Sequence, residues 1–197
     1  MRKLSVFNSL TLDGVMQAPG RPDEDRRGGF AHGGWAIPYA DPVMGQVMAE
    51  GMAGSGSLLL GRRTYEDFFS FWPGQTGNPI SEVLDNTLKL VASTTLAEPL
   101  EWRNSELLAG DAADAVAALK EQPGDDLTVL GSGELIQSLR RRDLIDEYLL
   151  LIHPLVLGSG RRLFPDGGPA AALRMVDAKP TTTGVLIATY QPEGASR

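Results

Sequence analysis

The sequence contains no cysteine and only two histidines, His32 and His153. The lack of cysteine excludes disulfides, thiolate metal sites and cysteine nucleophiles, and it is typical of proteins from a reducing compartment. Two histidines far apart in the sequence do not provide the spaced ligand set of a metal centre. We therefore predict a cytoplasmic protein without a bound metal.

Long apolar runs and an excess of basic residues are also missing. No stretch approaches the roughly 20 apolar residues that a membrane helix needs, and the N-terminus lacks the apolar region of a signal peptide. Lysine and arginine number 18 against 25 aspartates and glutamates, which gives a net charge of −7. Since nucleic-acid and membrane-surface binding both rely on a basic footprint, we expect neither partner. A bound anion would need a local group of arginines.

The 197 residues predict a single domain over 1–197. Short buried strands are predicted at Leu4–Leu10, Ser57–Leu60, Lys89–Ser93, Leu127–Leu130 and Tyr148–Ile152. Helices are predicted at Pro42–Met52, Thr64–Phe71, Ala112–Glu121 and Glu134–Arg141, with Asp111 as the N-cap of the third. This alternation indicates an α/β fold whose sheet is mostly parallel and covered on both faces. Leu173–Ala178 and Thr183–Gln191 lack a helix between them and predict an antiparallel C-terminal edge.

Residues 17–34 form a long irregular segment rich in glycine, proline, aspartate and arginine. Loops of this length are usually functional or disordered, so we consider a lid over a substrate. Its charged run, Asp23–Arg27, is interpreted as a solvated loop.

Ligands of parallel sheets bind beyond the carboxyl ends of the strands. Gly131-Ser132-Gly133 follows a strand and opens a helix, which predicts an anion site at free backbone N–H groups or else a structural turn. The triplet Gly54-Ser55-Gly56 is interpreted as a plain turn, and Gly158-Ser159-Gly160 as an ordinary loop. Neither the dinucleotide fingerprint GxGxxG nor the P-loop is present.

A second strand end carries adjacent arginines. Gly61 ends a buried strand, and Arg62 and Arg63 open the next helix. The planar arginine fork suits phosphate oxygens, and the helix N-terminus favours an anion. The alternative is a solvated helix start whose arginines pair with Glu66 or Asp67.

These segments together resemble dihydrofolate reductases. Gly61-Arg62-x-Thr64-x-Glu66 is similar to their 2′-phosphate segment, Ser93-Thr94 to the next strand end, and Gly131–Glu134 to their pyrophosphate turn. Ser9–Gly14 and Ile152–Gly160 resemble the C-terminal pyrimidine-reductase domain of the bifunctional riboflavin-biosynthesis deaminase-reductase. Dihydrofolate reductases join consecutive glycines in the pyrophosphate turn by a cis peptide. Ser132 takes the middle place here, which leaves the geometry of this turn open.

The resemblance implies a three-layer dihydrofolate-reductase-like fold that binds NADPH. It implies cofactor contacts from Ser9 and Met16 at the nicotinamide, from Gly61, Arg62, Arg63, Thr64, Ser93 and Thr94 at the 2′-phosphate, and from Gly131, Ser132, Gly133, Glu134 and Leu135 at the pyrophosphate. By the same analogy a homodimer through the C-terminal strands is expected.

The substrate side departs from the family pattern. Trp35–Asp41 resembles the dihydrofolate reductase segment that carries the substrate carboxylate, but it is one residue longer. Trp35 is thus expected near the substrate, and Asp41 is either the catalytic acid or the N-cap before Pro42. Asp13 is either catalytic or a residue that shapes its loop. His153 is interpreted as a structural hydrogen-bonding residue.

The implied reaction is hydride transfer from NADPH to a pyrimidine-, ribosylamine- or pteridine-like small molecule. The riboflavin-type segments favour 5-amino-6-(5-phosphoribosylamino)uracil as the acceptor. A dihydrofolate reductase activity, or an NADPH-binding protein without turnover, are the alternatives.

Overall fold

The fold is described from a computed structural model over residues 1–53 and 56–194. Its strands are β1 (Leu4–Thr11), β2 (Ser57–Gly61), β3 (Leu88–Ala92), β4 (Ser105–Leu107), β5 (Leu127–Leu130), β6 (Glu147–His153), β7 (Leu173–Pro180) and β8 (Leu186–Pro192). Its α-helices are α1 (Pro42–Ala53), α2 (Arg62–Phe71), α3 (Pro79–Asn86), α4 (Ala112–Glu121) and α5 (Gly133–Arg140). Single 3-10 turns occur at Arg27–Gly29, Ile37–Tyr39 and Trp72–Gly74. Gly54 and Ser55 of the first glycine triplet lie outside the described residues.

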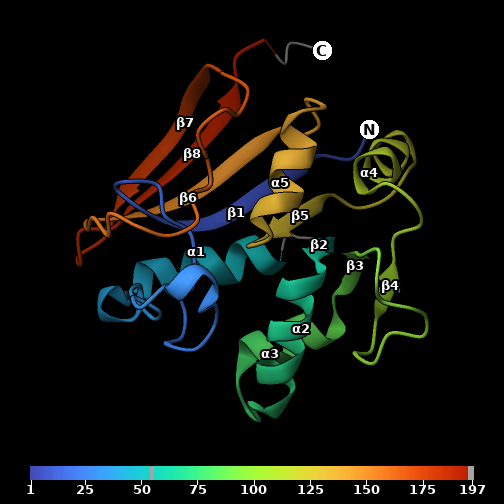
Figure 1. Ribbon diagram of the computed structural model, residues 1–197, viewed down its shortest axis with the longest axis horizontal. Coiled ribbons are helices and arrows are strands. Elements are labelled where there is room, and N and C mark those ends of the chain that lie inside the picture. Colours follow the sequence, from blue (N-terminus) through green and yellow to red (C-terminus); the bar gives the residue numbers. More distant parts are fainter. Residues whose placement is uncertain (54–55, 195–197) are drawn as a thin grey trace.

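All eight strands belong to one sheet in the order β4-β3-β2-β5-β1-β6-β8-β7 (Figure 1). The first six strands in this order, from β4 through β6, pair with their neighbours in parallel. Strand β8 pairs antiparallel with β6, and β7 pairs antiparallel with β8. The predicted mixed sheet with an antiparallel C-terminal edge is therefore confirmed. Six parallel strands end at one edge of the sheet, which brings six loops together there.

Alternating side chains along each strand build two cores on opposite faces. Val6 and Leu59 pack with helices α4 and α5, whereas Leu58 packs with α2 and α3. Leu151 and Ile187 pack against α1 on that second face. Helices thus cover both faces of the sheet, and the predicted three-layer α/β fold is confirmed.

Two elements were not predicted. Helix α3 begins after Asn78, whose side-chain oxygen accepts a hydrogen bond from the N–H of Ile80. Strand β4 has three residues, and Glu106 at its centre is exposed. The α4 start was predicted correctly, because the Asp111 carboxylate accepts from the N–H groups of Ala113 and Asp114.

The edge strand β7 is almost wholly exposed, and Met175 projects into solvent from it. The homodimer expected from the resemblance stays a prediction. No helix among residues 1–53 and 56–194 is both long and apolar enough to pass through a lipid bilayer.

Lys89 of β3 is a buried cation in the sheet. Its side chain has no exposed surface, and its Nζ donates to the carbonyl oxygens of Leu84 at 2.7 Å and Thr87 at 2.9 Å. The same Nζ lies 4.4 Å from the ring centroid of Trp102. Burial lowers the pKa of Lys89 to about 8.

This lowered pKa predicts a pH-dependent stability. Between the folded pKa of about 8 and the unfolded value of about 10.4, the unfolded chain binds more protons at this site. Stability therefore rises with pH in this window. We expect the free energy of unfolding of the unmodified protein to increase relative to Lys89→Met from about pH 8 to about pH 10 in urea titrations. A difference that stays constant across the window would contradict the lowered pKa.

Candidate functional site

The turn after β5 has an unusual backbone. Gly131 and Ser132 both have positive φ values, +54° and +56°, and Ser132 is the left-handed residue before α5. Among the described residues only Glu98–Pro99 is a cis peptide, so the Gly131–Ser132 bond is trans. The Ser132 side chain does not cap α5. The first N–H groups of this helix therefore have no internal partner and remain open to an anion.

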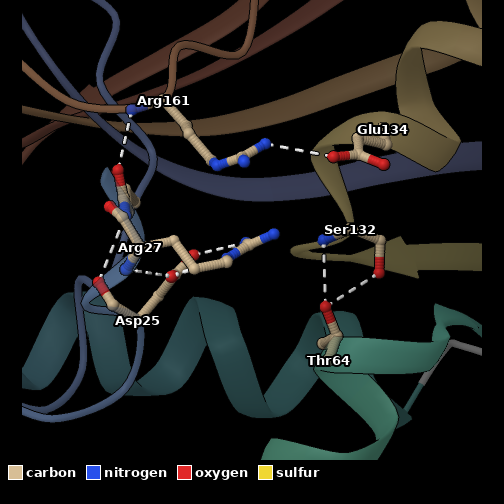
Figure 2. Close-up of polar contacts among 7 residues, drawn as sticks. Asp25, Arg27, Thr64, Ser132, Glu134 and Arg161 are labelled. Atoms are coloured by element: carbon tan, nitrogen blue, oxygen red, sulfur yellow. Dashed lines mark hydrogen bonds and ion pairs between the residues drawn. The ribbon is translucent and has the colours of Figure 1, made fainter. Parts of the chain in front are cut away.

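Ser132 also ties this turn to the neighbouring turn between β2 and α2 (Figure 2). Its Oγ accepts from the N–H of Gly61 at 2.9 Å and lies 3.1 Å from Thr64 Oγ1. Thr64 Oγ1 in turn accepts from the N–H of Ser132 at 3.2 Å. The two loops that the sequence assigned to one dinucleotide are thus held together by their own side chains.

A cavity of about 1260 Å³ lies beyond the carboxyl ends of the parallel strands. Every residue that the sequence assigned to the cofactor lines it: Ser9, Met16, Gly61, Arg62, Arg63, Thr64, Ser93, Thr94, Gly131, Ser132, Gly133, Glu134 and Leu135. Ligand pockets are usually about 300–1000 Å³, so this cavity has room for more than one small molecule. The roles of these lining residues in cofactor binding stay predictions.

The charges around the cavity are balanced, in contrast to the net charge of −7 of the whole chain. Six arginines line it, namely Arg21, Arg27, Arg62, Arg63, Arg161 and Arg162. Six carboxylates also line it, namely Glu24, Asp25, Asp67, Asp111, Glu134 and Asp166. The local group of arginines that an anion requires is therefore present.

Two of these arginines face the start of α5 and were missed from the sequence. Arg161 Nη1 is paired with Glu134 Oε1 at 3.0 Å. Figure 2 shows this pair and the Arg27 side chain extended toward Ser132. The carboxylate of Asp25 holds Arg27 through two hydrogen bonds and raises the pKa of Arg27. Burial raises the pKa of Asp25, but its bonds with Arg27 outweigh this effect and lower the pKa overall.

The interpretation of Asp23–Arg27 as a solvated loop was wrong for Glu24, Asp25 and Arg27. These side chains are partly buried and line the cavity. Gln17 holds them there: its Nε2 donates to the carbonyl oxygens of Asp25 and Arg27, and its Oε1 accepts from the N–H of Arg161. The sequence did offer one indication that this segment lines the site, namely the arginines within the long segment 17–34 that follows strand β1.

The two candidate catalytic aspartates do not line the cavity. Asp41 Oδ1 accepts from the N–H of Val43 at 2.7 Å, and Oδ2 accepts from both the hydroxyl and the N–H of Thr182. The Thr182 hydroxyl lowers the pKa of Asp41. This geometry favours the helix-cap alternative, in which Asp41 joins the start of α1 to the β7–β8 connection.

Asp13 has the contacts of a residue that shapes loops. Its carboxylate accepts from the Thr11 hydroxyl and from the N–H groups of Leu157 and Gly158. The Thr11 hydrogen bond lowers the pKa of Asp13. The end of β1 is thereby fixed to the loop after β6.

Trp35, the residue expected near the substrate, does not line the cavity but packs against His153, which does. The Trp35 indole N–H donates to the carbonyl of Gln17, and its ring meets the His153 ring edge-on at 5.1 Å. His153 lines the cavity, and its Nδ1 lies 3.2 Å and 3.0 Å from the carbonyl oxygens of Leu10 and Leu151. Burial lowers the pKa of His153, which favours the neutral ring.

The loop after β6 depends on a glycine. Gly160 has φ +122°, and an added Cβ would lie 2.7 Å from both Phe30 Cε2 and Val15 Cγ1. Gly158 also has a positive φ, +76°, but an added Cβ there would meet nothing within 4 Å. The absence of a side chain at Gly160 thus lets this loop pack closely against Phe30 and Val15.

This contrast predicts different costs for two alanine substitutions. Gly160→Ala adds a clash to backbone strain and should lower the free energy of unfolding by about 3 kcal/mol. Gly158→Ala adds strain alone and should cost about 1 kcal/mol. Chemical denaturation of both variants provides the measurement, and equal costs would show that the contact with Phe30 and Val15 is not important.

The fold and the cavity define an α/β protein with a large cavity at the carboxyl edge of a mostly parallel sheet. The chain belongs to the RibD C-terminal domain family, which it matches over residues 2–187. It is 28% identical over 199 residues to the uncharacterized protein YyaP of Bacillus subtilis (strain 168), covering 98% of this chain and 96% of that protein. The uncharacterized protein YwjB of the same organism is 26% identical over 123 residues, covering 62% and 66%.

Two solved structures share the fold. A putative riboflavin biosynthesis protein from Shewanella sp. PV-4 has a TM-score of 0.73 at 24% identity, covering 97% of this chain and 99% of that one. A pyrimidine reductase-like protein from Corynebacterium diphtheriae has a TM-score of 0.60 at 12% identity, with 97% and 92% covered. The suspected relation to the pyrimidine-reductase domain is therefore confirmed at the level of family and fold.

Proposed function

We propose that this protein is an NADPH-dependent reductase that delivers a hydride to a polarised double bond of a pyrimidine-, ribosylamine- or pteridine-like heterocycle. The observation that carries the proposal is the convergence of all thirteen sequence-assigned cofactor residues on one cavity. The family membership supports a reductase, and the words riboflavin biosynthesis and pyrimidine reductase-like describe the two structural neighbours.

The shape of the pyrophosphate turn fits a dinucleotide. A Cβ on Gly131 would lie 3.3 Å from the Thr64 side chain, and one on Gly133 would lie 3.0 Å from Met16 Sδ, so the two glycines leave room that a side chain would narrow. The free N–H groups at the start of α5 would hold the pyrophosphate. Arg27 would add to them through Nη1, because its carboxylate partner, Asp25, engages only Nε and Nη2. NADPH supplies the hydride when bound, and the protein orients the reactants and excludes water.

Neither Asp41 nor Asp13 is placed to donate the proton that accompanies the hydride. Both carboxylates are occupied by backbone N–H and hydroxyl donors outside the cavity wall. We therefore propose that the proton that accompanies the hydride comes from water.

The test of the proposal is a fluorescence titration of the purified protein with NADPH in the presence of EDTA, followed by NADPH oxidation with a panel of acceptors. The panel includes 5-amino-6-(5-phosphoribosylamino)uracil, dihydrofolate and an unphosphorylated dihydropterin. Cofactor binding with oxidation supports a reductase, and binding without oxidation of any acceptor indicates a non-catalytic NADPH-binding protein. No binding at millimolar NADPH would reject both.

We predict that the protein prefers NADPH to NADH and that Arg63 is the main reason. Arg62 is paired with Glu66 at 3.0 Å, whereas the exposed Arg63 lines the cavity beside it. A hydrogen bond to a charged group corresponds to about a ten- to hundredfold change in affinity. Arg63→Ala should weaken NADPH by about this factor and leave NADH unchanged.

The matched control is Arg103→Ala, which removes an exposed arginine outside the cavity. It should leave both dissociation constants unchanged. Equal dissociation constants for NADPH and NADH in the unmodified protein would defeat the assignment of this end of the cavity.

For Arg27 we expect a loss of affinity that does not distinguish NADPH from NADH. Arg27 faces the turn that would hold the pyrophosphate, which NADPH and NADH share (Figure 2). Arg27→Gln should therefore weaken both cofactors by a similar factor, about tenfold or more. Isothermal titration of the two cofactors is the measurement, and a loss confined to NADPH would move Arg27 to the 2′-phosphate end.

A further inference from the structure

The cavity continues past the sequence-assigned cofactor residues into an apolar region. Its walls there come from three helices that cover one face of the sheet, and its apolar lining includes Met44, Met48, Phe68, Phe71, Ile80 and Leu84. The first two belong to α1, the next two to α2 and the last two to α3. Apolar and aromatic walls favour an apolar ring system over a sugar phosphate, because a phosphate loses its hydration there without compensation.

Arg21 lines the cavity and contacts Phe71 of this apolar region, and its guanidinium is already paired with a carboxylate. Its Nη2 is paired with Asp67 Oδ1 at 2.5 Å, and its guanidinium carbon lies 4.4 Å from the centroid of the Phe71 ring. A second carboxylate, Asp23 Oδ1, lies 3.7 Å from Arg21 Nε. A phosphate would have to displace carboxylates from Arg21 and would be repelled by them.

Glu24 brings a further acidic group to the same wall. Its Oε2 accepts from the N–H groups of Gly20 at 2.7 Å and Arg21 at 3.0 Å, and no described residue donates to its Oε1. Burial raises the pKa of both Glu24 and Asp67. Ring N–H donors would stabilise the ionised form of these carboxyl groups, whereas a neighbouring anion would disfavour that form further.

Taken with the proposed reductase function on which it rests, we propose that the substrate is an unphosphorylated planar nitrogen heterocycle whose ring N–H groups are held by Glu24. Asp67 and Asp23 keep Arg21 from binding a phosphate group. The acceptor is then the ring system of a pyrimidine or pteridine carrying a neutral substituent, and a phosphoribosyl group is excluded by charge.

The experiment compares ligands that differ only in a phosphate. Calorimetric titrations use 5-amino-6-(ribosylamino)uracil with its 5′-phosphate, and 6-hydroxymethyl-7,8-dihydropterin with its phosphate ester, each with and without NADPH. We expect the unphosphorylated member of at least one pair to bind about tenfold tighter or more, as one charged contact implies. Tighter binding of the phosphorylated members, equal binding within both pairs, or no binding of any of the four would overturn the proposal.

Three variants locate the cause. Glu24→Gln can keep the hydrogen bonds to the Gly20 and Arg21 N–H groups, yet it should weaken the unphosphorylated ligand by about tenfold. The control Glu106→Gln removes the same charge from an exposed residue of β4 that does not line the cavity, and it should have little effect. Asp67→Asn frees Arg21 and should strengthen the phosphorylated ligand selectively. Thermal unfolding confirms that each variant is folded.

These outcomes are separable from those of the proposed function. Loss of NADPH binding rejects the reductase proposal, whereas titrations without cofactor still measure the preference between phosphorylated and unphosphorylated rings. Unchanged ligand affinity in both Glu24→Gln and Asp67→Asn would overturn the assignment of these residues.

Discussion

The site depends on the hydrogen bonds that Ser132 makes across two strand ends. Strands β2 and β5 are neighbours in the sheet, so their following turns lie side by side. Ser132 Oγ accepts from the Gly61 N–H, and Thr64 Oγ1 accepts from the Ser132 N–H. This exchange fixes the starts of α2 and α5 relative to each other. The arginines of one helix and the open N–H groups of the other then face a single cavity.

The sequence was sufficient for the parts of the structure that depend on local patterns. Buried strands such as Leu58–Leu60 and a capped helix after Asp111 follow from hydrophobicity and capping chemistry. Strand ends in a parallel sheet converge by topology, which is why residues as distant as Ser9 and Thr94 were assigned together and line one cavity. Short elements with mixed polarity, such as α3 and β4, carry too little pattern to be recognised.

Contacts across long sequence distances were beyond local patterns. Nothing near Arg27 indicates that Gln17 anchors its loop against Arg161, because that contact depends on how β1 and β6 pair. Asp41 was ambiguous for a similar reason. Its second partner is Thr182, 141 residues away, and only the antiparallel edge brings the two together.

Glu24 and Arg27 lie three residues apart on one segment and both line the cavity, Glu24 beside Arg21 and Arg27 toward Ser132 (Figure 2). A molecule that fixes Arg27 therefore also restrains the backbone that carries Glu24, and the reverse holds. A coupling between the two regions through this backbone would act by the same factor in both directions, as thermodynamic linkage requires. The 17–34 segment thus joins the two regions of the cavity through one short stretch of backbone.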